Sequence, residues 1–224
     1  LHEKRLPPTG KELIVIMILV IIPGLLIARQ PDLGTSLLVI VAGLIVVFLS
    51  GIPFRYIFSL IILCIPSSLL LWKFMKDYQR QRVLTLINPD TDPLGAGYNI
   101  IQSKIAMGSG GIFGKGWTNG SQVQLEFLPE KNTDFIFAVV GEEFGLLGVL
   151  TILTLYILII GRGLYIASNA SDLYGRLLAG SISLTFFVYV FVNTAMVIGL
   201  MPIVGIPLPL ISYGGTSMVT LMIG

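Results

Sequence analysis

Acidic side chains that lie beside an apolar segment are the first candidates for chemistry in this sequence. Asp134 directly precedes the apolar stretch that begins at Phe135, which predicts a carboxylate at a lipid–water boundary. Burial at such a boundary would raise its pKa and suit it to abstract a proton as a general base. A helix N-cap formed by Thr133 or Asp134 would explain the same pattern. The residues alone support the catalytic and the capping interpretation equally.

Two further acids, Glu142 and Glu143, lie inside the same apolar stretch. On a straight helix, which rises 1.5 Å per residue, they would lie about 12 to 14 Å beyond Asp134 and could not reach water easily. Glu142 shares a helix face with Ala138 and Gly145, and small residues form a seam that permits close helix contact. This small-residue seam consists of Gly141, Gly145 and Gly148. We expect Glu142 to be a structural or cavity residue that pairs with a base elsewhere in the bundle.

Arg29 and Asp32 flank Pro31 at the junction of two apolar stretches. An arginine at a helix C-terminus and an aspartate in the first turn of the next helix both complement the helix dipoles, which is a sufficient explanation. A charged pair at a membrane boundary could also hold a diphosphate and orient a neighbouring carboxylate. Under this second interpretation, Arg29 and Asp32 approach the same cavity as Asp134.

A glycine-rich run at 108–116 contains Lys115. It is not a P-loop, because Lys115 is followed by glycine rather than by serine or threonine, and the dinucleotide fingerprint breaks at Phe113. The run is either a flexible turn or a loop whose bare backbone lets a phosphate-bearing substrate approach closely. Nucleotide binding is therefore disfavoured.

Three prolines, at 202, 207 and 209, precede Ser212 and the pair Gly214-Gly215. They predict a rigid turn that re-enters a span at the glycine pair. Non-helical backbone at membrane depth is tolerated only where it is buried in protein or lines a cavity. A simple connector between two spans is the alternative.

The composition requires a membrane protein. Of the 224 residues, 54% are hydrophobic and 12% are charged, whereas soluble domains carry about 25% charged residues. A net charge of +2 from scattered residues gives no reason to expect a nucleic-acid partner. The single cysteine, Cys64, and the single histidine, His2, exclude a disulfide, a zinc site and a cysteine-protease site within this chain. Catalysis must come from carboxylates, lysines or hydroxyls.

Apolar stretches fall at roughly 12–28, 35–51, 55–72, 135–160 and 177–200, and a sixth begins near 214. In hydrocarbon such stretches must be helices, because an open strand edge would leave backbone groups unpaired. The predicted fold is therefore all-α, a polytopic transmembrane helix bundle in which residues 1–224 form a single membrane domain. The chain starts without Met and stops inside an apolar stretch, so we expect it to be part of a longer protein.

Basic residues in the short connections predict the orientation of the spans, because they gather on the cytoplasmic side. They are Lys4, Arg5, Lys11, Arg55, Arg162 and Arg176. The segment at about 73–134 then becomes a long extracytoplasmic loop. Its aromatic residues argue against disorder, and an apolar periodicity near 98–107 predicts a short helix lying on the membrane.

Taken together, these motifs resemble the SEDS (shape, elongation, division and sporulation) family of peptidoglycan glycosyltransferases. They are Gln30-Pro31-Asp32-Leu33-Gly34-Thr35-Ser36, Gly114-Lys115-Gly116-Trp117, Gln124-Leu125-Glu126-Phe127-Leu128-Pro129-Glu130, Thr133-Asp134-Phe135-Ile136-Phe137, Glu142-Glu143, and Pro207-Leu208-Pro209-Leu210-Ile211-Ser212-Tyr213-Gly214-Gly215. The likeness covers essentially the whole chain, and the second and third motifs favour the elongation branch over the division branch. Members of the family usually have about ten spans, so this chain resembles spans five to ten.

The resemblance implies polymerisation of lipid II at the outer face of the bacterial inner membrane. The 4-hydroxyl of one sugar attacks the anomeric carbon of another and expels undecaprenyl diphosphate. Asp134 matches the essential aspartate of the family and would be the general base. No cofactor is certain, although Mg²⁺ or Mn²⁺ could assist the departure of the diphosphate, and the metal ligands are unknown. The implied partners are a class B penicillin-binding protein of the penicillin-binding protein 2 type and other membrane proteins of the elongation machinery.

The candidate substrate-binding residues are Arg29, Asp32, Lys115, Lys131 and Ser212, and the candidate structural or cavity residues are Glu142, Gly214 and Gly215. A lipid II flippase or transporter is the alternative function, since a bundle with interior carboxylates and a broken re-entrant turn also fits that class. A transporter needs its site near the membrane midplane, whereas the enzyme needs its carboxylate at the outer face. A scaffold that only recruits a transpeptidase has no need of Asp134.

Overall fold

The structure is a computed structural model that describes residues 8–30, 32–53, 56, 73, 75–92, 95–125, 127–128 and 130–214. Within these ranges every regular element is a helix, which confirms the all-α prediction. Outside them lie the predicted apolar stretch at 55–72 except for Tyr56, the predicted stretch beyond 214, and the residues His2, Lys4, Arg5, Pro31, Arg55, Cys64 and Gly215.

Three helices are long and apolar enough to cross a membrane: α1 (Gly10–Ala28), α7 (Ile136–Asn169) and α8 (Leu173–Val197). A fourth, α2 (Leu33–Leu49), is apolar but shorter. These helices confirm the predicted helical stretches at 12–28, 35–51, 135–160 and 177–200.

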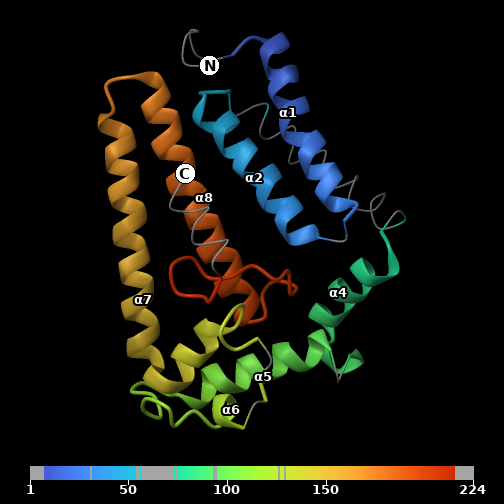
Figure 1. The fold of residues 1–224 in the computed structure, drawn as a ribbon, viewed down its shortest axis with the longest axis vertical. Helices are drawn as coiled ribbons and strands as arrows, with labels where there is room; N and C mark the ends of the chain where they lie inside the picture. Colours follow the sequence, from blue (N-terminus) through green and yellow to red (C-terminus); the bar gives the residue numbers. More distant parts are fainter. Residues whose placement is uncertain are drawn as a thin grey trace. The chain divides into compact units, whose positions relative to one another are not determined.

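The chain forms two compact units, and each is described by itself. The first unit comprises Leu1–Arg80 and Arg162–Thr185. In it, α1 and α2 run side by side (Figure 1). The Ser36 hydroxyl of α2 donates a hydrogen bond to the Gly24 carbonyl of α1 at 2.7 Å, and a Cβ at Gly43 would lie 2.3 Å from Val20. Small residues at these crossings therefore let the two helices approach closely.

The second unit comprises Gln81–Gly161 and Phe186–Gly224. The segment that precedes α7 contributes α4 (Asp77–Ile87), the 3-10 helix η1 (Pro89–Thr91), α5 (Ala96–Ser109) and α6 (Ser121–Gln124). α5 confirms the helix predicted near 98–107. α4 begins in the first unit, and α7 and α8 contribute residues to both units.

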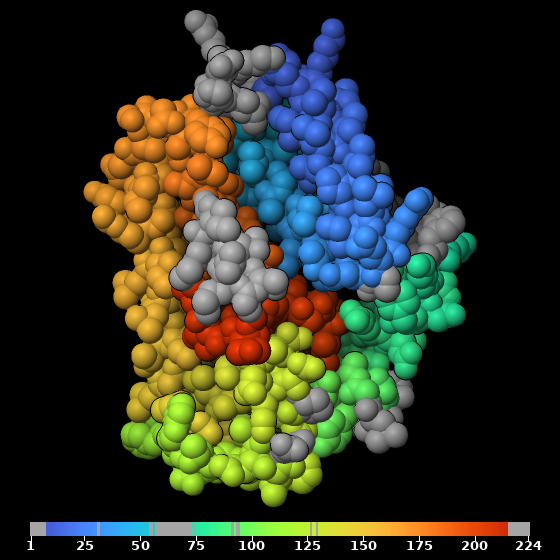
Figure 2. Space-filling model, in the orientation of Figure 1, coloured from blue at the N-terminus to red at the C-terminus, as the bar shows by residue number. Residues whose placement is uncertain are grey.

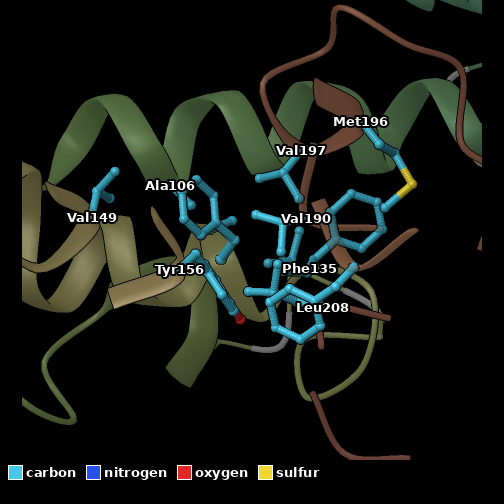
Figure 3. Close-up of a cluster of buried hydrophobic side chains, with 12 residues drawn as sticks. Ala106, Phe135, Val149, Tyr156, Val190, Met196, Val197 and Leu208 are labelled. Carbon is cyan, nitrogen blue, oxygen red and sulfur yellow. The ribbon is translucent and has the colours of Figure 1, made fainter. Parts of the chain in front are cut away.

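The core of the second unit joins α5, α7, α8 and the segment that follows α8. Figure 3 shows this cluster, with Phe135 and Leu208 packed near Val190 and the Tyr156 ring. The Tyr156 and Phe186 rings meet edge to face with centroids 5.7 Å apart. Apolar packing therefore fixes the start of α7 and the chain after α8 against each other.

Candidate active site

α7 is broken at Gly145, which has φ 65° and ψ −158°. In a continuous helix, the N–H groups of the next residues would donate to carbonyls four residues earlier. Here Leu146 N–H donates to Gly111 O at 2.9 Å, and Leu147 N–H donates to Ile112 O at 3.2 Å. Figure 1 shows α7 changing direction near its start, beside α5 and α6. The glycine-rich run thus supplies acceptors that the helix itself has lost.

The same run also supplies the missing donors. Lys115 N–H and Gly116 N–H donate to the carbonyls of Glu142 and Glu143, each at 3.0 Å. Residues 110–116 are called the 110–116 loop from here on. At the break, two hydrogen bonds within α7 are replaced by four hydrogen bonds between α7 and this loop. These bonds hold its backbone against α7, which argues against the interpretation of the run as a flexible turn.

The predicted small-residue seam of α7 contacts this region. A Cβ at Gly141 would lie 2.2 Å from Met107 Sδ, and a Cβ at Gly145 would lie 2.3 Å from Gly114 N. The close contact that the glycines permit is therefore made with the end of α5 and the loop that follows it.

Glu142 is completely buried, and four donors converge on one oxygen of its carboxylate. Oε1 accepts from Lys115 Nζ at 2.6 Å, from the Ser121 hydroxyl at 3.1 Å, from Gln122 N–H at 3.1 Å and, at 3.5 Å, from the Ser109 hydroxyl. The base expected to pair with Glu142 is thus Lys115. α7 is not the straight, isolated helix that the sequence predicts, and the segment 115–122 reaches the Glu142 carboxylate directly.

Three successive backbone carbonyls before α7 accept hydrogen bonds from the last part of the chain. They are Asn132 O from Tyr213 N–H at 2.8 Å, Thr133 O from the Ser212 hydroxyl at 2.5 Å, and Asp134 O from Asn193 Nδ2 at 2.9 Å. Figure 2 shows the red C-terminal residues lying directly against yellow-green residues that precede α7. The backbone of Asp134 is therefore held from α8 and from the segment after it.

The Asp134 carboxylate has a different environment from its backbone. It is partly buried, and no residue in the described ranges donates a hydrogen bond to it. Burial raises the pKa of the Asp134 carboxyl above its ordinary value of 3.8, and the charge of Glu130 raises it further. The Thr133 hydroxyl donates to Glu130 Oε2 at 2.7 Å. Among the described residues, no hydrogen bond supports the capping interpretation, and the carboxylate is available to a ligand.

Comparison with known proteins adds the family. Residues 2–224 match the model of the FtsW, RodA and SpoVE cell cycle proteins. The chain belongs to this family. It is 57% identical over 219 residues to the peptidoglycan glycosyltransferase MrdB of Escherichia coli K12, covering 97% of this chain and 59% of MrdB. This member of the FtsW/RodA/SpoVE family therefore spans about three-fifths of the length of that relative.

Other relatives agree with the predicted branch. Peptidoglycan glycosyltransferase RodA of Treponema pallidum is 45% identical over 168 residues, which cover 75% of this chain and 39% of that protein. A probable peptidoglycan glycosyltransferase FtsW of Geobacter metallireducens is 41% identical over 203 residues, which cover 91% of this chain and 54% of that protein. The identity to MrdB and RodA exceeds the identity to FtsW.

Two solved structures of the family share the fold. A chain of a peptidoglycan synthase complex that coordinates polymerization and crosslinking matches with a TM-score of 0.78 and 36% identity, over 98% of this chain and 61% of that one. A mutant of Thermus thermophilus rod shape determining protein RodA has an aspartate replaced by alanine. It matches with a TM-score of 0.62 and 25% identity, over 96% of this chain and 55% of that one.

Arg29 and Asp32 occupy the helix ends that the dipole interpretation predicted. Arg29 is the C-cap of α1, and Asp32 caps α2 by accepting from Thr35 N–H at 3.0 Å. Arg29 also lines a cavity of about 400 Å³ with Lys76 and apolar residues of α1. Both belong to the first unit and Asp134 belongs to the second, so their approach to Asp134 stays a prediction.

The other candidate substrate-binding residues have structural contacts. Lys115 pairs with Glu142, and Lys131 Nζ donates to Val123 O at 3.0 Å. The Ser212 hydroxyl donates to a backbone carbonyl and accepts from Leu208 N–H at 2.7 Å. Substrate binding by these residues stays a prediction, as does a cavity role for Gly214. Gly215 lies outside the described residues.

Asn193 is a residue of this site that the sequence interpretation missed. It is completely buried, and Nδ2 donates both to Asp134 O at 2.9 Å and to Ile206 O at 2.7 Å. The available signal was an amide inside an apolar stretch, because such a side chain must find partners in the protein. That signal indicates a partner without saying which one.

Few of the described side chains near Asp134 could bind the expected Mg²⁺ or Mn²⁺. The residues in the described ranges contain no group of three or more His, Cys, Asp or Glu that could hold an ion. Mg²⁺ is usually bound by one or two carboxylates together with substrate phosphates. Asp134, with Glu130 beside it, fits such a set only when the substrate completes it, and a metal requirement stays a prediction.

Proposed function

We propose that the complete protein is a peptidoglycan glycosyltransferase that polymerises lipid II into glycan strands during cell elongation, with Asp134 as the general base. The observation that carries the proposal is the 57% identity over 219 residues to MrdB, a peptidoglycan glycosyltransferase. Because the chain spans 59% of the length of MrdB, further substrate contacts are assigned to the rest of the complete protein.

In the proposed reaction, Asp134 takes the proton from the 4-hydroxyl of the acceptor sugar. The oxygen then bonds to the anomeric carbon of the donor sugar, and the bond from that carbon to undecaprenyl diphosphate breaks. The proton remains on Asp134, and the electron pair leaves with the diphosphate. The raised pKa of the Asp134 carboxyl supports this role, because a stronger base removes a hydroxyl proton more readily. Its open hydrogen-bonding capacity supports it too.

The proposed setting is the bacterial inner membrane, with several spans and the active site on the periplasmic face. Three membrane-length apolar helices and the distribution of basic residues support this setting. The proposed partner is a class B penicillin-binding protein of the penicillin-binding protein 2 type. The fold shared with a chain of a peptidoglycan synthase complex supports this choice.

The test is polymer formation from labelled lipid II by the complete purified protein and its Asp134→Asn variant. Loss of a positioned general base typically lowers the rate about 100-fold to 10,000-fold, so visible polymer should disappear. Asp172→Asn is the matched control, because Asp172 also directly precedes a span and accepts from Gly175 N–H at 2.6 Å as a cap. This control should polymerise at the rate of the unmodified protein.

Two outcomes contradict the proposal. Polymerisation by Asp134→Asn at a near-normal rate removes the general-base assignment. If the folded, unmodified protein forms no polymer, yet lipid II crosses the bilayer of vesicles that contain it, the transporter function replaces the enzyme.

A further inference from the structure

The side-chain amide of Asn193 joins two backbone segments at the Asp134 site. The carbonyl of Asp134 has no helix partner, because Ala138 N–H donates to Phe135 O at 2.9 Å. Asn193 supplies the donor from α8 at 2.9 Å, and its second N–H donates to Ile206 O at 2.7 Å. Since Asn193 is completely buried, water cannot replace either bond.

The orientation of this amide follows from its acceptors. Both partners of Nδ2 are carbonyl oxygens, which accept hydrogen bonds and cannot donate them. A reversed amide would place Oδ1 against two carbonyl oxygens and leave both without a donor. Oδ1 is buried and has no partner among the described residues. The two N–H groups are therefore the groups that this position uses.

The second bond controls what faces the carboxylate. Ile206 follows Gly205, and a Cβ built on Gly205 would lie 3.6 Å from Asp134 Oδ2. Gly205 has φ 73°, in the left-handed region that favours glycine, and its bare α-carbon lies beside the carboxylate. One asparagine thus holds both the backbone that carries the carboxylate and the backbone that bounds it.

We infer that Asn193 is a positioning residue for the Asp134 carboxylate, acting through the carbonyls of Asp134 and Ile206. It sets where the carboxylate lies relative to the backbone at Gly205, and hence relative to the attacking sugar hydroxyl. The inference rests on the proposed function, because it assigns Asn193 a role in the reaction of Asp134.

The test uses the complete protein and measures kcat and KM for lipid II polymerisation across pH. Asn193→Leu keeps a similar volume and removes both donors. A misplacement of about 1 Å can cost about 100-fold in rate, so kcat should fall about 10-fold to 100-fold, with KM within about 3-fold. A residue that only supports the fold changes the amount of active protein, and leaves the pH profile of that protein unchanged.

Asn193→Asp provides a second readout in case Asn193→Leu does not fold. An ionised aspartate has no donor, whereas a protonated aspartate donates one hydrogen bond to one of the two carbonyls. The kcat of Asn193→Asp relative to the unmodified protein should therefore rise as pH falls. A ratio that is independent of pH contradicts the inference.

Tyr156→Phe is the matched control. The buried Tyr156 hydroxyl donates to Pro209 O at 2.6 Å, in the same segment that Asn193 holds at Ile206, and so bonds to that segment without bonding to Asp134. Its kcat should stay within about 2-fold of the unmodified value. An unchanged kcat in Asn193→Leu, or an equal loss in Tyr156→Phe, overturns the inference. If Asp134→Asn itself retains activity, the proposed function fails, whatever the Asn193 variants do.

Discussion

Asp134 lies just before α7 and Glu142 lies in the short part of α7 before Gly145, and their carboxylates have opposite surroundings. Glu142 is completely buried, and Lys115, Ser121 and Gln122 donate to it. The Asp134 carboxylate is partly buried and accepts no hydrogen bond from a described residue. Burying a charge is costly unless donors or a counter-charge compensate it. Glu142, whose Oε1 has a counter-charge and several donors, therefore has a structural role, although its Oε2 has no partner among the described residues. The Asp134 carboxylate, which has neither, is available to a substrate.

The largest stability effect is expected at the Glu142 end. Lys115→Met leaves the buried carboxylate without its counter-charge, which should lower the free energy of unfolding by about 3 kcal/mol. Thermal unfolding of the complete protein in detergent measures this change. Lys104→Met, which alters an exposed lysine of α5, should change stability by less than about 0.5 kcal/mol. Equal stability of the two variants would show that the Lys115–Glu142 pair does not hold this end.

A smaller loss is expected for Gly145→Ala, because the break needs backbone angles that are essentially restricted to glycine. This strain should cost about 1 to 3 kcal/mol, and the new Cβ would also displace the 110–116 loop. Gly161→Ala is the control in the same helix, since a Cβ there meets nothing within 4 Å. It should be neutral or stabilise by about 0.5 to 1 kcal/mol. A stabilised Gly145→Ala would mean that the break is not required.

At the Asp134 end, Glu130→Gln should shift the pH dependence of the proposed reaction. Removing the Glu130 charge lowers the pKa of the Asp134 carboxyl, so the acidic limb of kcat/KM should move to lower pH. The glutamine still accepts from the Thr133 hydroxyl. Asp90→Asn, at an exposed acid of η1, should leave the limb in place. If the acidic limb of kcat/KM also stays in place in Glu130→Gln, the Glu130 charge does not influence the titration of Asp134.

The smallest effect is expected in the thermal stability of Asp134→Asn, whose carboxylate makes no capping bond. Because the folded pKa is raised, the ionised carboxylate opposes folding above its unfolded pKa. The variant should therefore unfold at the same or a slightly higher temperature at neutral pH. The difference should vanish once pH falls below the unfolded pKa. A clear destabilisation at neutral pH would assign Asp134 to the structural class of Glu142.

Hydropathy predicted the helices, since α1, α7 and α8 are continuous apolar runs, and periodicity predicted α5. The position of Asp134 before a span also followed from the sequence. The break at Gly145 did not, because a glycine inside a helix is usually compatible with helical angles. Without the break, nothing indicated that Lys115 would be the partner of Glu142. Asn193 was missed because its partners are backbone carbonyls, which carry no sequence signal.

The four hydrogen bonds between the 110–116 loop and α7 all use backbone atoms, so they depend on the number of residues in the loop, as well as on the glycines that its close approach to α7 requires. Ile112 and Phe113 are 59% and 80% exposed, and their side chains can be exchanged without touching those bonds. Adding or deleting a single residue between Gly111 and Gly116 would shift the register of donors against acceptors and break several bonds together. Alignments of relatives should accordingly show no gaps in this loop, with variable letters at positions 112 and 113.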